Sequence, residues 1–259
     1  MNGIDISNYQ AGLDLAKAKA GGVEYAILKL SEGRTIADAS FDSFYAQATA
    51  CGLPVGAYVY SHALNPSDAI AEVNYALSLL KGRKLPLGLY MDVETYNQMS
   101  LSKQQLVDTC KAFCSAVEAA GYISGLYGSE YNLWTRVDPN DCGDTIVWVA
   151  HYGREPDCPC DLWQYSDKGS ISTYNGPVDL DGVRSLRFTE MVNGKQPQPE
   201  PEPTPAPTPA IEPTVDVVLL QTAMQLDGYW DKPIDGLNTA EWREKFCEYA
   251  GDVLGVKIP

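Results

Sequence analysis

The stretch Leu87-Gly88-Leu89-Tyr90-Met91-Asp92-Val93-Glu94 decides how the rest of the sequence is interpreted. It is an apolar, strand-like run that ends in two acids, Asp92 and Glu94. Side chains two apart on a strand point the same way, so the two carboxyls share one face, about 6–7 Å apart. Met91 and Val93 point to the opposite face, where we expect helices to pack. The stretch therefore predicts a buried strand with paired acids at its carboxyl end.

Seven further segments have the apolar, β-branched or aromatic composition of strands. They are 3–8, 25–30, 55–61, 124–127, 146–151, 162–165 and 177–180. Helical periodicity fills several of the gaps, over 14–20, 40–50, 67–80 and 102–120. Repeated strand–helix alternation implies parallel βαβ units, and eight strands favour closure into a barrel. Because the last connections are too short for full helices, we expect an α/β fold that is an irregular (β/α) barrel of eight strands and about five full helices.

A change in composition predicts the domain organisation. The segment 196–213 reads QPQPEPEPTPAPTPAIEP, and such dense proline excludes helix and favours an extended polyproline II spacer. We expect a barrel domain over 1–195, this Pro-rich linker, and a small helical domain over 214–259. Two amphipathic patterns, at 215–226 and 239–254, predict the helices of the last domain.

Charge and composition exclude several classes of partner. The net charge of -15 disfavours binding to nucleic acid and to anionic lipid. No apolar run reaches the roughly 18 residues that span a bilayer, so no membrane insertion is expected. The odd count of seven cysteines argues against a disulfide framework. Buried thiols or a metal site remain open, but with two histidines we expect no metal and no cofactor.

Acids and aromatics gather where the predicted strands end, which is where parallel barrels place their active sites. The candidate catalytic residues are Asp5, Asp92, Glu94 and Asp179. The candidate substrate-binding residues are Glu32, Tyr58, Tyr127, Trp148, Gln164 and Asp181. Two close carboxyls raise one pKa, which gives the protonated and ionised acids that glycosidic cleavage needs. Aromatic rings suit the apolar faces of sugars. The alternative interpretation of the paired acids is a salt-bridged or solvated surface pair.

Several of these residues stand in motifs that resemble those of a known family. Gly3-Ile4-Asp5-Ile6-Ser7-Asn8-Tyr9-Gln10 resembles the opening of the glycoside hydrolase family 25 muramidases, the Chalaropsis-type lysozymes common in bacteriophage endolysins. Asp92-Val93-Glu94 is similar to the family's catalytic pair of acids. Further matching segments, in the right order, are 26–33, 55–58, 146–150, 162–166 and 178–181.

The resemblance implies a retaining β-1,4-N-acetylmuramidase that cuts the glycan strands of peptidoglycan after N-acetylmuramic acid. It implies that Glu94 is the general acid and base. Asp92 would orient and charge-stabilise the 2-acetamido group or contribute directly to the retaining mechanism, and Asp5 and Asp179 would complete the acidic cluster. Asp181 stands where the family often has Asn, and of the two aspartates we expect Asp179 to face the site.

The C-terminal piece resembles, more weakly, the start of helical peptidoglycan-binding modules, through segments 220–221, 226–229 and 234–236. We expect it to bind the cell wall, with self-association as the alternative. The N-terminus has no signal-peptide pattern. The prediction is therefore synthesis in a host cytoplasm and holin-type release to the wall.

Two rival functions remain open from the sequence. One is a non-catalytic wall-binding protein built on the same barrel. The other is a wall amidase or Cys–His peptidase, which would need His62 or His151 beside a cysteine or zinc.

Overall fold

The computed structural model describes residues 1–195, 224 and 245–246. The chain divides into two compact units, Met1–Gln198 and Pro199–Pro259. The linker and the helical domain predicted over 196–213 and 214–259 lie, apart from 224 and 245–246, outside the described residues. No helix in the described part is both long and apolar enough to cross a membrane.

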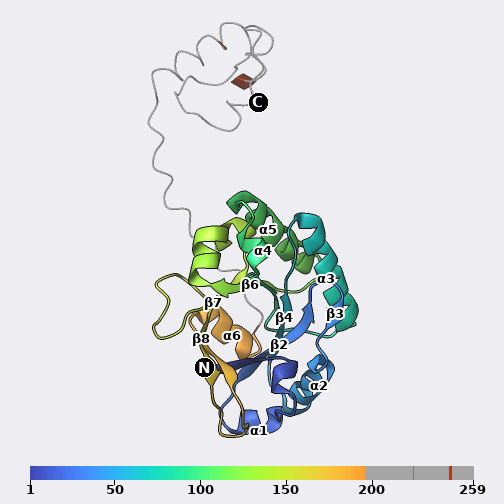
Figure 1. Cartoon of the computed structure of the whole chain (residues 1–259), viewed down its shortest axis with the longest axis vertical. Helices are drawn as coiled ribbons and strands as arrows, with labels where there is room; N and C mark the ends of the chain where they lie inside the picture. The colour runs from blue at the N-terminus through green and yellow to red at the C-terminus, as the bar shows by residue number, and fades with distance from the viewer. Residues whose placement is uncertain (196–223, 225–244, 247–259) are drawn as a thin grey trace. The chain divides into compact units, whose positions relative to one another are not determined.

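Eight strands form a closed barrel, which confirms the predicted architecture (Figure 1). In sheet order they run β1, β2, β4, β5, β6, β7, β8 and β9, and pairing of β9 with β1 closes the ring. Their bounds are β1 (Asn2–Ile6), β2 (Tyr25–Glu32), β4 (Val55–Tyr60), β5 (Leu89–Asp92), β6 (Ser124–Ser129), β7 (Ile146–Ala150), β8 (Leu162–Gly169) and β9 (Val178–Val183). A further two-residue strand, β3 (Ile36–Ala37), pairs with the end of β2.

The helices surround one part of the barrel. They are α1 (Leu15–Ala20), α2 (Phe41–Cys51), α3 (Pro66–Leu80), α4 (Tyr96–Met99), α5 (Lys103–Ala119) and α6 (Leu186–Val192). Single turns η1 (Asn8–Gln10), η2 (Asn132–Val137) and η3 (Pro139–Cys142) follow β1 and β6. The four predicted helices correspond to α1, α2, α3 and α5, whereas α4 and α6 had no prediction. The predicted start of α3 was late: Asn65 caps it and Pro66 occupies its first turn.

The direction of β9 corrects the prediction of a parallel barrel. β9 pairs antiparallel with both β8 and β1, whereas the pairs from β1–β2 round to β7–β8 are parallel. The segment 170–177 that joins β8 to β9 is too short for a crossover helix, so the strands form a hairpin. As a result Asp179, near the start of β9, lies opposite Asp5, near the end of β1.

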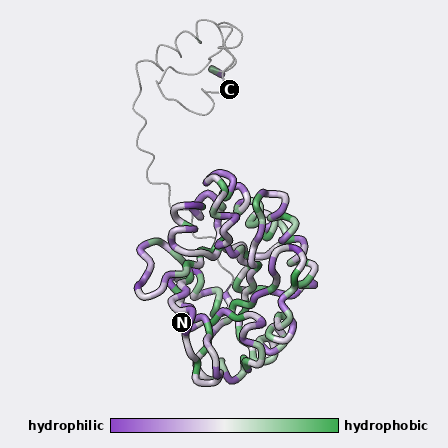
Figure 2. The backbone as a smooth tube through the Cα atoms, in the orientation of Figure 1, coloured by the Kyte–Doolittle hydropathy of each residue, from purple (hydrophilic) through white to green (hydrophobic). Residues whose placement is uncertain are grey.

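The interior of the barrel is filled by large side chains. Tyr25, Tyr90 and Trp148 are fully buried there, in a cluster that also contains Phe188 of α6. These rings need glycine beside them, because a Cβ on Gly3 would lie 2.1 Å from the Tyr25 ring. A second, larger apolar cluster lies between the outer face of the strands and helices α1, α2, α3 and α5. In Figure 2 the hydrophobic stretches run through the inside of residues 1–195 and the hydrophilic ones follow its periphery.

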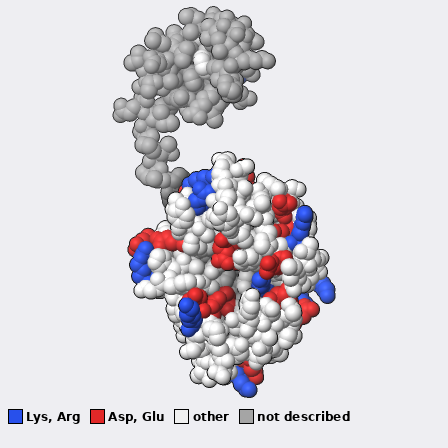
Figure 3. Space-filling view, viewed as in Figure 1, with Lys and Arg blue, Asp and Glu red and all other residues white. Residues whose placement is uncertain are grey.

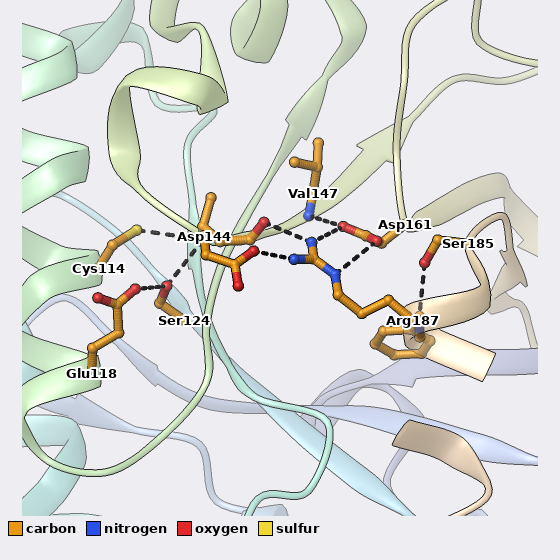
Figure 4. Close-up of polar contacts among 10 residues, drawn as sticks. Cys114, Glu118, Ser124, Asp144, Val147, Asp161, Ser185 and Arg187 are labelled. Carbon is orange, nitrogen blue, oxygen red and sulfur yellow. Dashed lines mark hydrogen bonds and ion pairs between the residues drawn. The ribbon is translucent and has the colours of Figure 1, made fainter. Parts of the chain in front are cut away.

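Helix α6 follows the last strand, β9, and a polar network attaches it to the end of the barrel where β7 and β8 begin (Figure 4). Arg187 of α6 pairs with Asp161 at 2.8 Å and with Asp144, and donates to the carbonyl of Thr145 at 3.1 Å. Asp161 also accepts from the backbone N–H of Val147 at 2.9 Å. A largely buried guanidinium thus connects α6 to the beginnings of β7 and β8, and with Phe188 it seals that end of the barrel.

The Arg187 network predicts a stability difference between two arginines three residues apart. Arg187→Met leaves the carboxyl of Asp161, which is 7% exposed, without its cationic partner. The free energy of unfolding should therefore fall by about 3 kcal/mol. Arg184→Met is the matched control, because its partner Glu155 is exposed and such pairs contribute less than about 1 kcal/mol. Denaturant unfolding followed by near-ultraviolet circular dichroism measures both. Equal losses in the two variants would contradict the structural role of Arg187.

Candidate active site

A polar cavity opens at the end of the barrel where the parallel strands finish. It has a volume of about 420 Å³. Its lining comprises Asp5, Ile6, Ser7, Tyr9, Gln10, Lys29, Glu32, Tyr58, Tyr60, Asp92, Glu94, Tyr127, Trp148, Gln164 and Asp179. The four predicted catalytic acids and five of the six predicted binding residues are therefore brought together. Figure 3 shows acidic side chains gathered across the middle of the visible face, with basic ones mostly toward its edges.

The two paired acids lie at and just beyond the end of β5. The strand ends at Asp92, two residues earlier than predicted, and Glu94 belongs to the connection to α4. Backbone contacts fix this connection: the N–H of Val93 donates to the Tyr127 carbonyl at 2.8 Å, and its carbonyl accepts from Asn132 at 3.0 Å. Asp92 is 3% exposed, whereas Glu94 is open to solvent. One carboxyl thus lies within the cavity and the other at its mouth.

Neither acid side chain has a hydrogen-bond or ion-pair partner among the described residues. Burial and the nearby charge of Glu94 raise the pKa of Asp92 well above its usual value. Loss of hydration in the cavity raises the pKa of Glu94, and the charge of Asp179 adds to that rise. Lys29 acts in the opposite direction on both pKa values. The site therefore favours a protonated carboxyl, and both acids are free to contact a bound molecule.

A hydrogen-bonded network occupies the other side of the cavity. Gln164 donates to Asp5 at 2.8 Å, and its side-chain oxygen accepts from the hydroxyls of Tyr127 at 2.8 Å and Tyr152 at 2.7 Å. The Tyr127 ring packs on Trp148 with 4.4 Å between centroids. Trp148 is only 1% exposed, so it forms the floor of the cavity rather than an open stacking surface. Asp5 is thus held by residues from distant strands.

Both aspartates of β9 point into the barrel, at different depths. Asp179 lines the cavity, and burial together with the charge of Asp167 raises its pKa to about 6. Asp181 is fully buried and lies beneath the cavity, where it accepts from the Trp148 indole at 2.8 Å. Of the predicted binding residues, Asp181 is the one that does not line the cavity. It lies behind the Trp148 ring, out of the cavity lining.

Several cavity residues were missed by the sequence interpretation. Tyr9 and Gln10 belong to η1, and Ser7 is its N-cap. Ser7 and Gln10 form a reciprocal capping box. The Ser-x-x-Gln spacing in the sequence could have predicted this turn. Lys29 is a charged residue within the apolar run of β2, and this break in the pattern could have identified it as a candidate site residue. It pairs with Glu32 at 3.2 Å and lies over the Tyr60 ring at 5.0 Å.

Among the described residues, the two histidines pair with glutamates and not with cysteines, so they do not form a catalytic Cys–His pair. His62 pairs with Glu32 at 3.1 Å and His151 with Glu130 at 2.9 Å. Burial raises the pKa of the Cys114 thiol to about 11 and that of Cys160 to about 12. Such thiols are poor nucleophiles at neutral pH. The Cys–His peptidase interpretation has no support in this part of the chain.

The family profile described as Glycosyl hydrolases family 25 matches residues 4–174. The chain belongs to this family. It is therefore a glycoside hydrolase, and the resemblance noted in the sequence is confirmed. The match ends before β9 and α6, so the closing strand with Asp179 and Asp181 lies beyond it.

Named relatives extend the comparison. An autolytic lysozyme of Clostridium acetobutylicum is 29% identical over 233 residues, covering 88% of this chain and 68% of its own. The CTP1L endolysin structure is 25% identical with a TM-score of 0.66, covering 74% of this chain and 69% of its own. The catalytic domain of endolysin ply40 from bacteriophage P40 of Listeria monocytogenes is 27% identical with a TM-score of 0.65, covering 74% and 97%.

The electrostatics of the cavity predict a shift in the pH–rate profile when Lys29 is replaced. Lys29→Met removes the cation that lowers the pKa of both Asp92 and Glu94. Both pKa values should rise, so the alkaline limb of kcat/KM should move to higher pH. Lys17→Met is the control, because the Lys17 side chain is 71% exposed and pairs outside the cavity. A limb that stayed in place or moved to lower pH would contradict the role assigned to Lys29.

Proposed function

We propose that the chain hydrolyses the glycan strands of bacterial peptidoglycan as a β-1,4-N-acetylmuramidase, with Glu94 as general acid and base. The supporting observation is the pair of unpartnered carboxyls, Asp92 and Glu94, in the polar cavity. The other buried acids around the barrel mouth are hydrogen-bonded to protein groups, which suits positioning rather than reaction. Membership of glycosyl hydrolase family 25 supports the reaction class.

The geometry suits a reaction in two displacements. In the first, Glu94 gives its proton to the glycosidic oxygen as the bond between that oxygen and the anomeric carbon breaks. The 2-acetamido oxygen or the Asp92 carboxylate forms a bond to the anomeric carbon from the opposite face. Positive charge that develops on the sugar ring is stabilised by the ionised acids of the cavity. In the second, the Glu94 carboxylate takes a proton from water as the water oxygen bonds to the anomeric carbon and the bond formed in the first displacement breaks. Two inversions give net retention.

Asp92 has two roles consistent with its position. It either orients and charge-stabilises the 2-acetamido group, whose oxygen then attacks the anomeric carbon, or it contributes directly to the first displacement. Both require the ionised form of Asp92 at the moment of reaction. Lys29 lowers the pKa of Asp92 and so favours that form. A bound sugar that separates the cavity from water makes this positive charge more effective.

The remaining lining residues fit a sugar ligand. Tyr58, Tyr60 and Tyr127 offer aromatic surface and hydroxyls, and Glu32 offers acceptor oxygens. Endolysin-type action at the wall accords with the similarity to two endolysin structures. Wall binding by residues 214–259 stays a prediction from the sequence, as does self-association through them.

Removal of the general acid is expected to abolish most of the activity. Glu94→Gln keeps the shape of the side chain but cannot donate or accept the reacting proton, so turnover should fall about 10²–10⁴-fold. Asp92→Asn should also be severe with the fold retained. Release of soluble wall fragments at a fixed enzyme concentration measures both, and Asp108→Asn on the surface of α5 is the control. Near-normal hydrolysis by Glu94→Gln would refute the assignment.

The identity of the cut bond tests the substrate assignment. Digestion of purified peptidoglycan should create new reducing ends on N-acetylmuramic acid and no new amino groups. Borohydride reduction followed by mass spectrometry of the products distinguishes the outcomes. Reduced N-acetylglucosamine ends would indicate a glucosaminidase instead, and new alanine N-termini would indicate an amidase or a peptidase.

A further inference from the structure

The side chain of Asp181 lies in a buried cluster of carboxyls under the cavity floor. One of its oxygens accepts from the Trp148 indole at 2.8 Å, while the other, Oδ2, has no donor among the described residues. The carboxyl of Asp5, itself 5% exposed, lies on the neighbouring strand and the same face of the sheet, because Gly3 pairs with Asp181 and Asp5 with Asp179. Its side chain interacts with those of both Asp181 and Asp179. Two carboxyls in hydrogen-bond contact require a proton between them, because both carboxylates can only accept.

Among the described residues, none of the groups that act on the pKa of Asp5 or Asp181 is a cation. Asp181 is faced by Asp179 on its own strand, by Tyr25 of β2, by Tyr90 of β5 and by Tyr165 of β8. Gln164 donates to Asp5 but carries no charge. Two adjacent negative charges without a neighbouring cation are costly in a buried position.

We propose that Asp5 and Asp181 share one proton at neutral pH, and that Asp181 is a positioning residue that holds Asp5 in place through this shared proton. Asp181 touches no substrate in this proposal. It acts on Asp5, and through Asp5 on Gln164 and Tyr127. The effect on hydrolysis rests on the proposed muramidase function, whereas the shared proton itself does not.

Burial raises the pKa of Asp5 well above its ordinary value and that of Asp181 to about 7. The pair titrates as a unit, so the proton belongs to both residues. When it is lost, the two carboxylates repel each other and Asp5 loses its contact with Asp181. The side of the cavity that Gln164 and Tyr127 form then loses its support.

An asparagine at 181 provides a sharp test, because its amide reproduces the hydrogen bonds without titrating. Its oxygen can accept from Trp148 and its NH₂ can donate to Asp5. Asp181→Ala removes both contacts and should lower kcat/KM about tenfold, the effect typical of one lost buried partner. Asp181→Asn should restore much of that loss and move the alkaline limb of the pH–rate profile to higher pH. Asp108→Asn controls for the loss of one negative charge.

Stability provides a readout that does not depend on hydrolysis. A carboxyl whose pKa is raised in the folded state binds more protons there than in the unfolded chain. Wild-type stability should therefore fall as pH rises from about 4, the ordinary value, to about 7, the value of Asp181. In Asp181→Asn that fall should shrink, so the melting temperature of the variant should gain on the wild type across this window. Infrared spectra at neutral pH should show a protonated-carboxyl absorption that is weaker in Asp181→Asn than in the wild type.

The outcomes separate the proposal from the proposed function. Parallel melting curves against pH for wild type and Asp181→Asn, with no difference in the infrared band, would overturn the shared proton. A changed stability curve with an unmoved alkaline limb would overturn the link to Asp5 positioning. A wild type that never cleaves peptidoglycan would refute the muramidase assignment, and the melting and infrared data would still decide the shared proton.

Discussion

The rest of the structure depends on the way β9 closes the barrel. This strand lies between β8 and β1 and runs antiparallel to both. A parallel last strand would have placed its final residues at the cavity end. The reversed strand brings its beginning there instead, so Asp179 meets Asp5 and Asp181 lies one step deeper. The acidic floor of the site exists because of this reversal.

Closure of the opposite end is the second condition for the site. Tyr25, Tyr90, Trp148 and Phe188 fill the barrel interior, and the network of Arg187 fixes α6 across the base. The cavity consequently opens in one direction, toward the ends of the parallel strands. Its acids lose water on all other sides, which is why desolvation is the leading cause of their raised pKa values.

Four of the acids in and beneath the cavity divide into two groups by their partners. Asp5 accepts a hydrogen bond from Gln164, and Asp181 accepts one from Trp148. Asp92 and Glu94 have no hydrogen-bond or ion-pair partner among the described residues. Burial raises the pKa of both, and the charge of Lys29 lowers it. This division is the basis of our proposal that one group positions the site and the other takes part in the reaction.

The sequence by itself determined most of the fold and the membership of the site. Alternating apolar patterns located the eight strands and four helices, because burial on a barrel demands periodic side chains. Acids at strand ends identified Asp5, Asp92, Glu94 and Asp179. The tertiary structure alone decided the direction of β9, the depth of Asp181 and the part played by Lys29. Strand direction and depth depend on pairing between residues more than a hundred positions apart, such as Asp5 with Asp179, and local periodicity carries no information about such pairing.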